Sequence, residues 1–181
     1  MGINRGKQFE DRLQKQFEKL KNTNITRLYD VTMGYSGVNN PCDFIIYKYP
    51  NIFYMEAKAI HGNCLNFKSH IKDNQWDKLL EYSQTNGVRA GIICWFIDRD
   101  TTLYLPIQYL AYLDDIGEKS FNINKSYRDD MLNGILVFGE KKRVFFEYDL
   151  KNLLKDISDY ESNTKIGPGY IWRKDRKNVK K

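Results

Sequence analysis

Cysteine is scarce in this sequence and does not occur in closely spaced pairs. Only Cys42, Cys64 and Cys94 are present among the 181 residues. An odd number of cysteines without a C-x-x-C pair argues against a disulfide framework and against a zinc ribbon. A zinc site built from Cys42, His61 and Cys64 is an alternative, but structural zinc usually takes four ligands in tighter pairs. The cysteine pattern therefore fits a reducing cytoplasm.

Long hydrophobic runs are missing as well. The longest apolar run, Ala90 to Ile97, is far shorter than the about 20 residues that a membrane-spanning helix needs. The first residues carry charge, and Gly6 stands where a myristoylation signal requires serine or threonine. No G-x-S-x-G, P-loop or GxGxxG motif occurs either. We therefore expect a cytoplasmic protein without a membrane partner.

What the sequence does have is a positive charge concentrated at one end. Its net charge is +6, and residues 164–181 hold seven lysines and arginines against Asp175 alone. Residues 1–163 are therefore formally neutral, and their length fits a single domain. The basic tail, which also contains Tyr170 and Trp172, either contacts a polyanion or is a disordered, solubilising end.

Hydrophobic periodicity predicts an alternation of helices and strands. The first helix spans residues 4–21, and Asn4 is its candidate N-cap. Next come three strands, a helix and a strand, at 25–31, 42–48, 52–59, 73–85 and 88–97. The last part contains a strand, a short helix, a second hairpin and a final helix, at 103–107, 107–116, 135–138 with 143–148, and 150–159. The fold class is α/β, with a mixed β-sheet flanked by helices.

The first hairpin, formed by residues 42–48 and 52–59, brings two carboxylates together. A turn over residues 48–51 pairs Tyr47 with Ile52, and counting outward from that pair places Asp43 opposite Glu56. Two carboxylates that face each other repel, so the arrangement calls for a compensating cation. Mg²⁺ fits, because it takes one or two carboxylates, keeps several waters and accepts phosphate oxygens. The pattern indicates a phosphodiesterase site.

Lys58 lies on the same face of its strand as Glu56. It would orient or help to deprotonate an attacking water and stabilise charge on the scissile phosphate, and the carbonyl of Ala57 could add a metal ligand. An exposed, charged sheet face is the alternative, since D-x(12)-E-x-K occurs often by chance. However, Glu56 and Lys58 interrupt the apolar run over residues 52–60, which is costly unless these charges have a role.

Two further polar residues are candidates for the same site. Glu10 falls at the margin of the apolar stripe of the first helix, where it either reaches the site or is an ordinary solvated glutamate. Gln75 lies in the first turn of the helix at 73–85, where it either holds water or phosphate beside the helix N-terminus or is simply exposed.

In combination these residues resemble the PD-(D/E)xK nuclease superfamily, and within it the Holliday-junction resolvases of the RecU and archaeal Hjc kind. Residues 4–10, N-R-G-K-Q-F-E, resemble the opening helix of these resolvases, and residues 34–43 resemble the glycine and serine loop before the first metal-binding aspartate. Glu56-Ala57-Lys58 resembles the E-x-K element, and residues 70–76 resemble the RecU helix that follows. The resemblance covers about residues 3–105 and departs in two places. Cys42 separates Pro41 from Asp43, and the stalk before this aspartate is short, at about 29–40.

The resemblance implies a restriction-endonuclease-like core of order α-β-β-β-α-β. Length and charge distribution place the nuclease domain at residues 1–163. The resemblance also implies metal-dependent cleavage of branched DNA. The metal, Mg²⁺ or alternatively Mn²⁺, would be held by Asp43, Glu56 and Glu10, and Lys58 and Gln75 would complete the catalytic set. Phosphate contacts are expected at Arg5, Lys7, Ser36, Lys72 and the tail residues Arg173, Lys174, Arg176 and Lys177.

A Holliday-junction resolvase acting in recombination or repair is the leading hypothesis. A homodimer is expected, because paired cuts in a two-fold symmetric junction are most simply made by a C2 dimer. A restriction or repair endonuclease on linear duplex is an alternative, since fold does not fix substrate. A non-catalytic DNA-binding protein of the same fold is another, and the intact Asp43, Glu56 and Lys58 argue against it.

Overall fold

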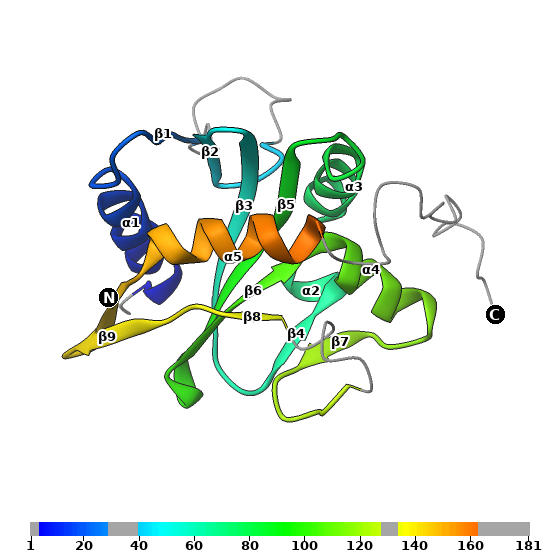
Figure 1. Ribbon diagram of the computed structural model, residues 1–181. Coiled ribbons are helices and arrows are strands. Elements are labelled where there is room, and N and C mark those ends of the chain that lie inside the picture. The colour runs from blue at the N-terminus through cyan, green and yellow to red at the C-terminus, as the bar shows by residue number, and fades with distance from the viewer. Residues whose placement is uncertain (1–3, 29–39, 128–133, 163–181) are drawn as a thin grey trace, which may run out of the picture.

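The computed structural model describes residues 4–28, 40–127 and 134–162, whose centre is a six-stranded mixed sheet of order β1-β2-β3-β5-β6-β8 (Figure 1). The central strands β3 and β5 pair in parallel, and the other neighbours pair antiparallel. The strands of this sheet are β1 (Asn24–Arg27), β2 (Phe44–Lys48), β3 (Asn51–Ile60), β5 (Val88–Phe96), β6 (Thr101–Pro106) and β8 (Ile135–Leu136). The predicted α/β class with a mixed sheet is confirmed.

Helices cover both faces of the sheet. On one face lie α1 (Arg5–Phe17), α5 (Leu150–Ser162) and the hairpin of β9 (Gly139–Lys142) and β10 (Phe145–Tyr148), and α5 crosses the front of Figure 1. On the other face lie α2 (Phe67–His70), α3 (Asp73–Tyr82), α4 (Ile107–Asp115) and the small sheet of β4 (Cys64–Asn66) and β7 (Ser120–Asn122). A short 3-10 helix, η1 (Ile97–Arg99), links β5 to β6. No helix in these ranges is long and apolar enough to cross a membrane.

The central strand β5 separates two hydrophobic cores. Ile93 and Trp95 pack with α1 and α5, whereas Ile92 and Cys94 pack with α3 and α4. A strand that is covered on both faces needs apolar side chains on both of them, which is why its sequence is one continuous apolar run. The predicted order α-β-β-β-α-β is confirmed, with β4 and α2 added between β3 and α3.

The start of α1 follows the sequence prediction. The side chain of Asn4 accepts a hydrogen bond of 3.1 Å from the backbone N–H of Lys7, so Asn4 is the N-cap. Phe9, Leu13 and Phe17 form the buried stripe. The helix ends at Phe17, before the predicted end at residue 21.

The hairpin of β2 and β3 has the predicted register. Tyr47 lies opposite Ile52, and the ladder continues to Phe44 opposite Met55. Phe44 and Met55 are the last pair of the ladder, and residues 43 and 56 follow directly beyond it, as the sequence count expects.

The predicted hairpin between 135–138 and 143–148 is wrong. Residues 135 and 136 pair with β6 at the edge of the main sheet, while β10 pairs with β9, whose sequence is Gly-Glu-Lys-Lys. Because every residue of β9 is exposed, that strand has no apolar alternation by which it could be found. The short elements β4, α2 and β7 were not predicted for a related reason, since each has four residues or fewer. The predicted strand at 25–31 ends at residue 27, and positions 29–31 lie outside the described residues.

The close contact of β5 and β6 leads to a stability prediction. A methyl group on Gly91 would lie 2.6 Å from the carbonyl oxygen of Leu105 and 2.7 Å from the ring of Tyr104. Gly91→Ala should therefore lower the free energy of unfolding by about 1–3 kcal/mol, because neither neighbour can move freely. Gly6→Ala in α1 is the control, since the added methyl would meet its nearest neighbour, Asn4, at 3.4 Å and favours the helix. Urea unfolding measures both variants, and wild-type stability of Gly91→Ala would contradict this packing.

Candidate active site

The site begins on β3, which carries Glu56 and Lys58 in its middle. These residues alternate with Met55 and Ala57, whose side chains pack in the same core as α1. Glu56 and Lys58 therefore point to the other face of the sheet, toward the layer that contains α2 and α3. The parallel neighbour β5 gives no polar side chain next to them, because Ile92 and Cys94 are the residues paired with Glu56 and Lys58.

Asp43 is held beside Glu56 by the backbone of β3. Its Oδ2 accepts a hydrogen bond of 2.8 Å from the backbone N–H of Ala57. The carboxylate thus lies across the strand from Glu56, directly before β2 begins. Two acidic groups from neighbouring strands meet at this point of the sheet.

Glu56 is the most deeply buried of the acidic groups, with 2% of its surface exposed. Lys58 Nζ donates to its Oε1 at 2.6 Å. The side chain of Gln75, from the first turn of α3, interacts with Glu56 and also favours the charged form. The second oxygen, Oε2, has no hydrogen-bond partner of normal geometry in the part of the chain that is described.

Burial raises the pKa of both carboxyl groups. The pKa of Asp43 is raised to about 7, first because the group is buried and second because Glu56 is charged, against the opposing effects of the Ala57 N–H and of Lys58. The pKa of Glu56 is also raised by burial, although Lys58 and Gln75 work in the other direction. A cation placed between the two groups would remove the repulsion and restore both pKa values.

Glu10, on α1, lies close enough to this site to be affected by its charges. Burial and then the charge of Asp43 raise its pKa, while Arg27 and Lys58 lower it, so its carboxylate lies within electrostatic range of both site strands. Arg27 on β1 holds Glu10 in place with an Nη2 to Oε2 contact of 2.7 Å. The same guanidinium also pairs with Asp11, which ties the helix to the edge of the sheet.

Two polar neighbours of the site, Arg27 and His70, were not identified from the sequence. His70 Nδ1 accepts a hydrogen bond of 3.1 Å from the backbone N–H of Asn66, and burial followed by the charge of Lys58 lowers the pKa of the imidazole. No periodic signal could have found His70, because α2 is a single turn. Arg27 carried a signal, since it is a charged residue inside a predicted strand.

Three of the residues predicted to contact phosphate lie in the part of the chain that the structure describes. Arg5 lies over the Phe145 ring at 5.7 Å, Lys7 is exposed on α1, and Lys72 is exposed at the N-cap of α3. Lys72 is the one of the three beside the site, because its backbone N–H donates to Gln75 Oε1 at 3.4 Å. The other predicted contacts lie outside the described residues, namely Ser36, Arg173, Lys174, Arg176 and Lys177.

The donor set fits a hard divalent cation. Within the described ranges, no group of three or more His, Cys, Asp or Glu side chains is arranged to hold a metal ion. Mg²⁺ needs less than this, because it binds through one or two carboxylates and keeps its waters. Asp43 and Glu56 supply such a pair, and Glu56 Oε2 has no hydrogen-bond partner of normal geometry among the described residues. Oxygen donors suit Mg²⁺ or Mn²⁺ better than softer metals.

The zinc alternative finds no support in the geometry. His61 Nδ1 pairs with Asp98 at 2.8 Å, and the buried Cys42 donates its thiol to the carbonyl of Phe44 at 3.2 Å. Cys64 is exposed on β4. Cys42 and His61 thus have separate partners and Cys64 is exposed, so the three side chains do not form one site.

Comparisons with known proteins give a distant structural likeness. No protein-family description matches the sequence, and no curated protein matches it either. Among solved structures, the fold is similar to Hjc, a Holliday junction resolvase from the archaeal hyperthermophile Archaeoglobus fulgidus. The two chains are 19% identical, the match covers 72% of this chain and 95% of the resolvase, and the TM-score is 0.48. At that distance the function has to be inferred from the side chains themselves.

The raised pKa of Asp43 gives a prediction for the metal-free protein. Ionising this carboxyl costs stability in the fold, so stability falls as pH rises from about 4, the unfolded pKa, through the folded pKa of about 7. Asp43→Asn cannot ionise and keeps an oxygen that accepts from Ala57. In EDTA at pH 8 it should therefore be more stable than wild type by about 1–3 kcal/mol, a rise of a few degrees in Tm. At pH 4 the two proteins should unfold together.

Asp43→Ala separates charge from hydrogen bonding in this comparison. It removes the same charge but also the acceptor of the Ala57 N–H, so it should gain less stability than Asp43→Asn. Thermal unfolding by circular dichroism at both pH values measures these differences. A variant Asp43→Asn that is no more stable than wild type at pH 8 would show that the fold does not raise the pKa of Asp43.

Proposed function

We propose that this protein is a Mg²⁺-dependent endodeoxyribonuclease that hydrolyses phosphodiester bonds in branched DNA. Mn²⁺ is expected to replace Mg²⁺, because both prefer oxygen ligands. The observation that carries the proposal is the buried Glu56, which faces Asp43, pairs with Lys58 and leaves one oxygen without a partner. Such a group is costly to bury unless a cation and a substrate complete its contacts.

The chemistry follows from what each side chain can offer. Bound Mg²⁺ would polarise the scissile phosphate, with Asp43 and Glu56 as its protein ligands. Lys58 has three ammonium donors and uses one on Glu56, so the others can orient the attacking water and bind a phosphate oxygen. Gln75 holds Glu56 from the α3 side, and Glu10, fixed by Arg27, adds negative charge at the α1 side.

Branched DNA is proposed as the substrate on the basis of the sequence resemblance to the resolvases. Holliday junctions are the expected form, and a role in recombination or repair follows from that chemistry. A homodimer would supply two sites for two symmetric cuts. Arg5, Lys7 and Lys72 are proposed as phosphate contacts, and the excess of cations over anions in the whole chain suits a polyanion.

The test of the function is cleavage by Glu56→Gln. The glutamine keeps the shape of the side chain but loses the charge that would hold the metal, so the rate should fall at least about 1,000-fold. Binding of the junction should survive. The measurement is Mg²⁺-dependent cleavage of labelled four-way junction, linear duplex and single strand, under single-turnover conditions. Glu81→Gln, an exposed glutamate near the end of α3, is the matched control and should cut like wild type.

The outcomes of that assay separate the candidate functions. Cleavage of the junction in preference to duplex supports a resolvase, and equal or preferred cleavage of duplex indicates a restriction or repair enzyme. Binding without cleavage by the wild-type protein, in both Mg²⁺ and Mn²⁺, would indicate a DNA-binding protein. Glu56→Gln with a wild-type rate would remove the site from consideration.

Lys58 allows the catalytic role to be separated from metal binding. Lys58→Met keeps most of the aliphatic stem but removes the donors, so the cleavage rate should fall by about 100-fold or more. Mg²⁺ binding, followed by titration calorimetry, should remain, because both carboxylates are still present. A variant that fails to bind Mg²⁺ while it remains folded by circular dichroism would show that Lys58 supports the metal site instead of the reaction.

A further inference from the structure

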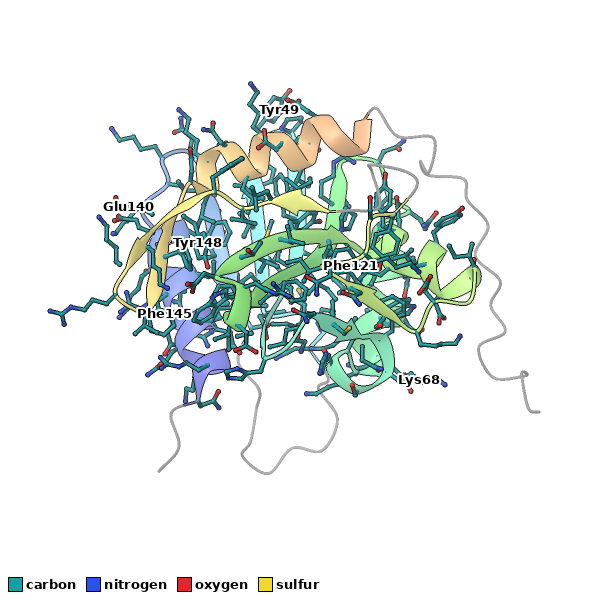
Figure 2. The ribbon with its side chains drawn as sticks, turned by 90° about the horizontal axis from the view of Figure 1, so that it is seen from below. Tyr49, Lys68, Phe121, Glu140, Phe145 and Tyr148 are labelled. Atoms are coloured by element: carbon teal, nitrogen blue, oxygen red, sulfur yellow. The ribbon has the colours of Figure 1, made fainter. Side chains whose placement is uncertain are left out.

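A second polar hollow lies away from the acidic site, between α1 and the β9–β10 hairpin. Its volume is about 430 Å³. The α1 side is lined by Gln8, Arg12, Lys15 and Lys19, and the hairpin side includes Lys142 and Phe145. Figure 2 shows Phe145 and Tyr148 beside α1, with Glu140 at the outer part of the hairpin. We call this hollow the α1 groove.

The α1 groove carries more positive than negative charge, and among its cations Lys142 pairs with Glu140. Its two acidic residues are Asp11, which pairs with Arg27, and Glu147. Among the residues that the structure describes, Arg12, Lys15 and Lys19 form no ion pair with a carboxylate. Positive groups that are gathered in a concave surface without partners favour an anionic ligand.

The spacing of these side chains suits an extended anion. Positions 8, 12, 15 and 19 follow one stripe along α1 and its C-terminal end, and eleven residues of helical rise span about 16 Å. One strand of duplex DNA carries a phosphate about every 3.4 Å along the axis, so the stripe runs beside about four or five phosphates. A small anion would occupy only part of such a groove.

The walls of the groove are fixed before any ligand binds. The guanidinium of Arg12 lies over the Phe145 ring at 4.5 Å. Gln16 joins the helix to β10, because its Nε2 donates to the carbonyl of Phe146 at 3.0 Å and its Oε1 accepts from the N–H of Tyr148 at 2.6 Å. Binding therefore does not have to order these walls, which favours affinity.

The groove and the acidic site lie on different sides of α1. Glu10 faces the site, and at 100° per residue the positions of Gln8, Arg12 and Lys15 lie about 140–160° around the helix axis from it. The apolar stripe of α1 is buried against the sheet, so DNA cannot surround the helix. A backbone strand lying in the α1 groove would therefore run along the side of α1 away from Glu10, and Asp11, which shares Arg27 with Glu10, marks the border between the two surfaces.

We propose that the α1 groove binds the sugar-phosphate backbone of a second arm of a branched DNA substrate, while the first arm is held at the acidic site. The proposal rests on the proposed nuclease function and adds a structural basis for preferring branched over linear DNA. Each lysine would neutralise one backbone phosphate, and Arg12, held by Phe145, would approach another.

The experiment compares two double variants that carry the same substitutions. Lys15→Gln/Lys19→Gln removes two exposed lysines, four residues apart, from the groove. Lys151→Gln/Lys155→Gln removes two exposed lysines, also four apart, from α5 and serves as the control. The full-length proteins are titrated onto labelled four-way junction and linear duplex by fluorescence anisotropy, over a salt series, with Ca²⁺ in place of Mg²⁺.

The groove variant should bind the junction about tenfold more weakly, and the slope of log affinity against log salt should fall by about 2. Its binding to linear duplex should change less than about threefold, and the α5 control should behave like wild type on both. Unchanged junction binding, or an equal loss on junction and duplex, would overturn the proposal. Unchanged DNA binding with loss of binding to poly-glutamate would assign the groove to an acidic protein segment and would also overturn it.

This readout is independent of the catalytic assignment. If Glu56→Gln cut as fast as wild type while the groove variant lost junction affinity, the acidic site would be wrong and the groove would stand. If Glu56→Gln were inactive and the groove variant bound both DNAs like wild type, the groove would be wrong and the acidic site would stand.

Discussion

The burial of the Glu56 carboxylate is the constraint on which the rest of the site depends. A glutamate in the middle of a strand with core on both sides can remain only if its neighbours supply charge and hydrogen bonds. Lys58 supplies one of these contacts from the same strand, and Asp43 adds a second negative charge from the next strand. The arrangement is unfavourable in isolation, and the proposed cation, bound between the two carboxylates, would relieve their repulsion.

Other contacts of the fold keep these groups in place. The backbone N–H of Ala57 fixes the Asp43 carboxylate, and the start of α3 brings Gln75 to Glu56. Arg27 has 7% of its side chain exposed and holds Glu10 against the edge of the sheet. Rigid strands and a helix N-terminus, instead of flexible loops, thus position most of the polar groups. This is the kind of support that a site needs if its geometry is to be precise.

The acidic pair could be predicted from the sequence because hairpin register is a matter of counting. Once a tight turn pairs Tyr47 with Ile52, side-chain alternation leaves no freedom in where residue 56 lies. Glu10 could be placed only at the margin of a helix face, since its contact with the site depends on how α1 packs against β1. Arg27 stood out only as a charge inside a predicted strand, and His70 gave no signal, because the roles of both come from tertiary contacts of short elements. The β9–β10 hairpin was misplaced because a strand of glycine, glutamate and lysines carries no hydrophobic alternation.

The side-chain amide of Gln16 has a consequence for how the molecule can associate. It donates to one residue of β10 and accepts from the residue two positions further on, as the backbone of an adjacent strand would. A helix thereby closes the open edge of the small sheet with a single side chain. That edge cannot recruit a strand from another molecule, which is how exposed strands promote aggregation. In the main sheet the two end strands are short, since β1 has four residues and β8 only two.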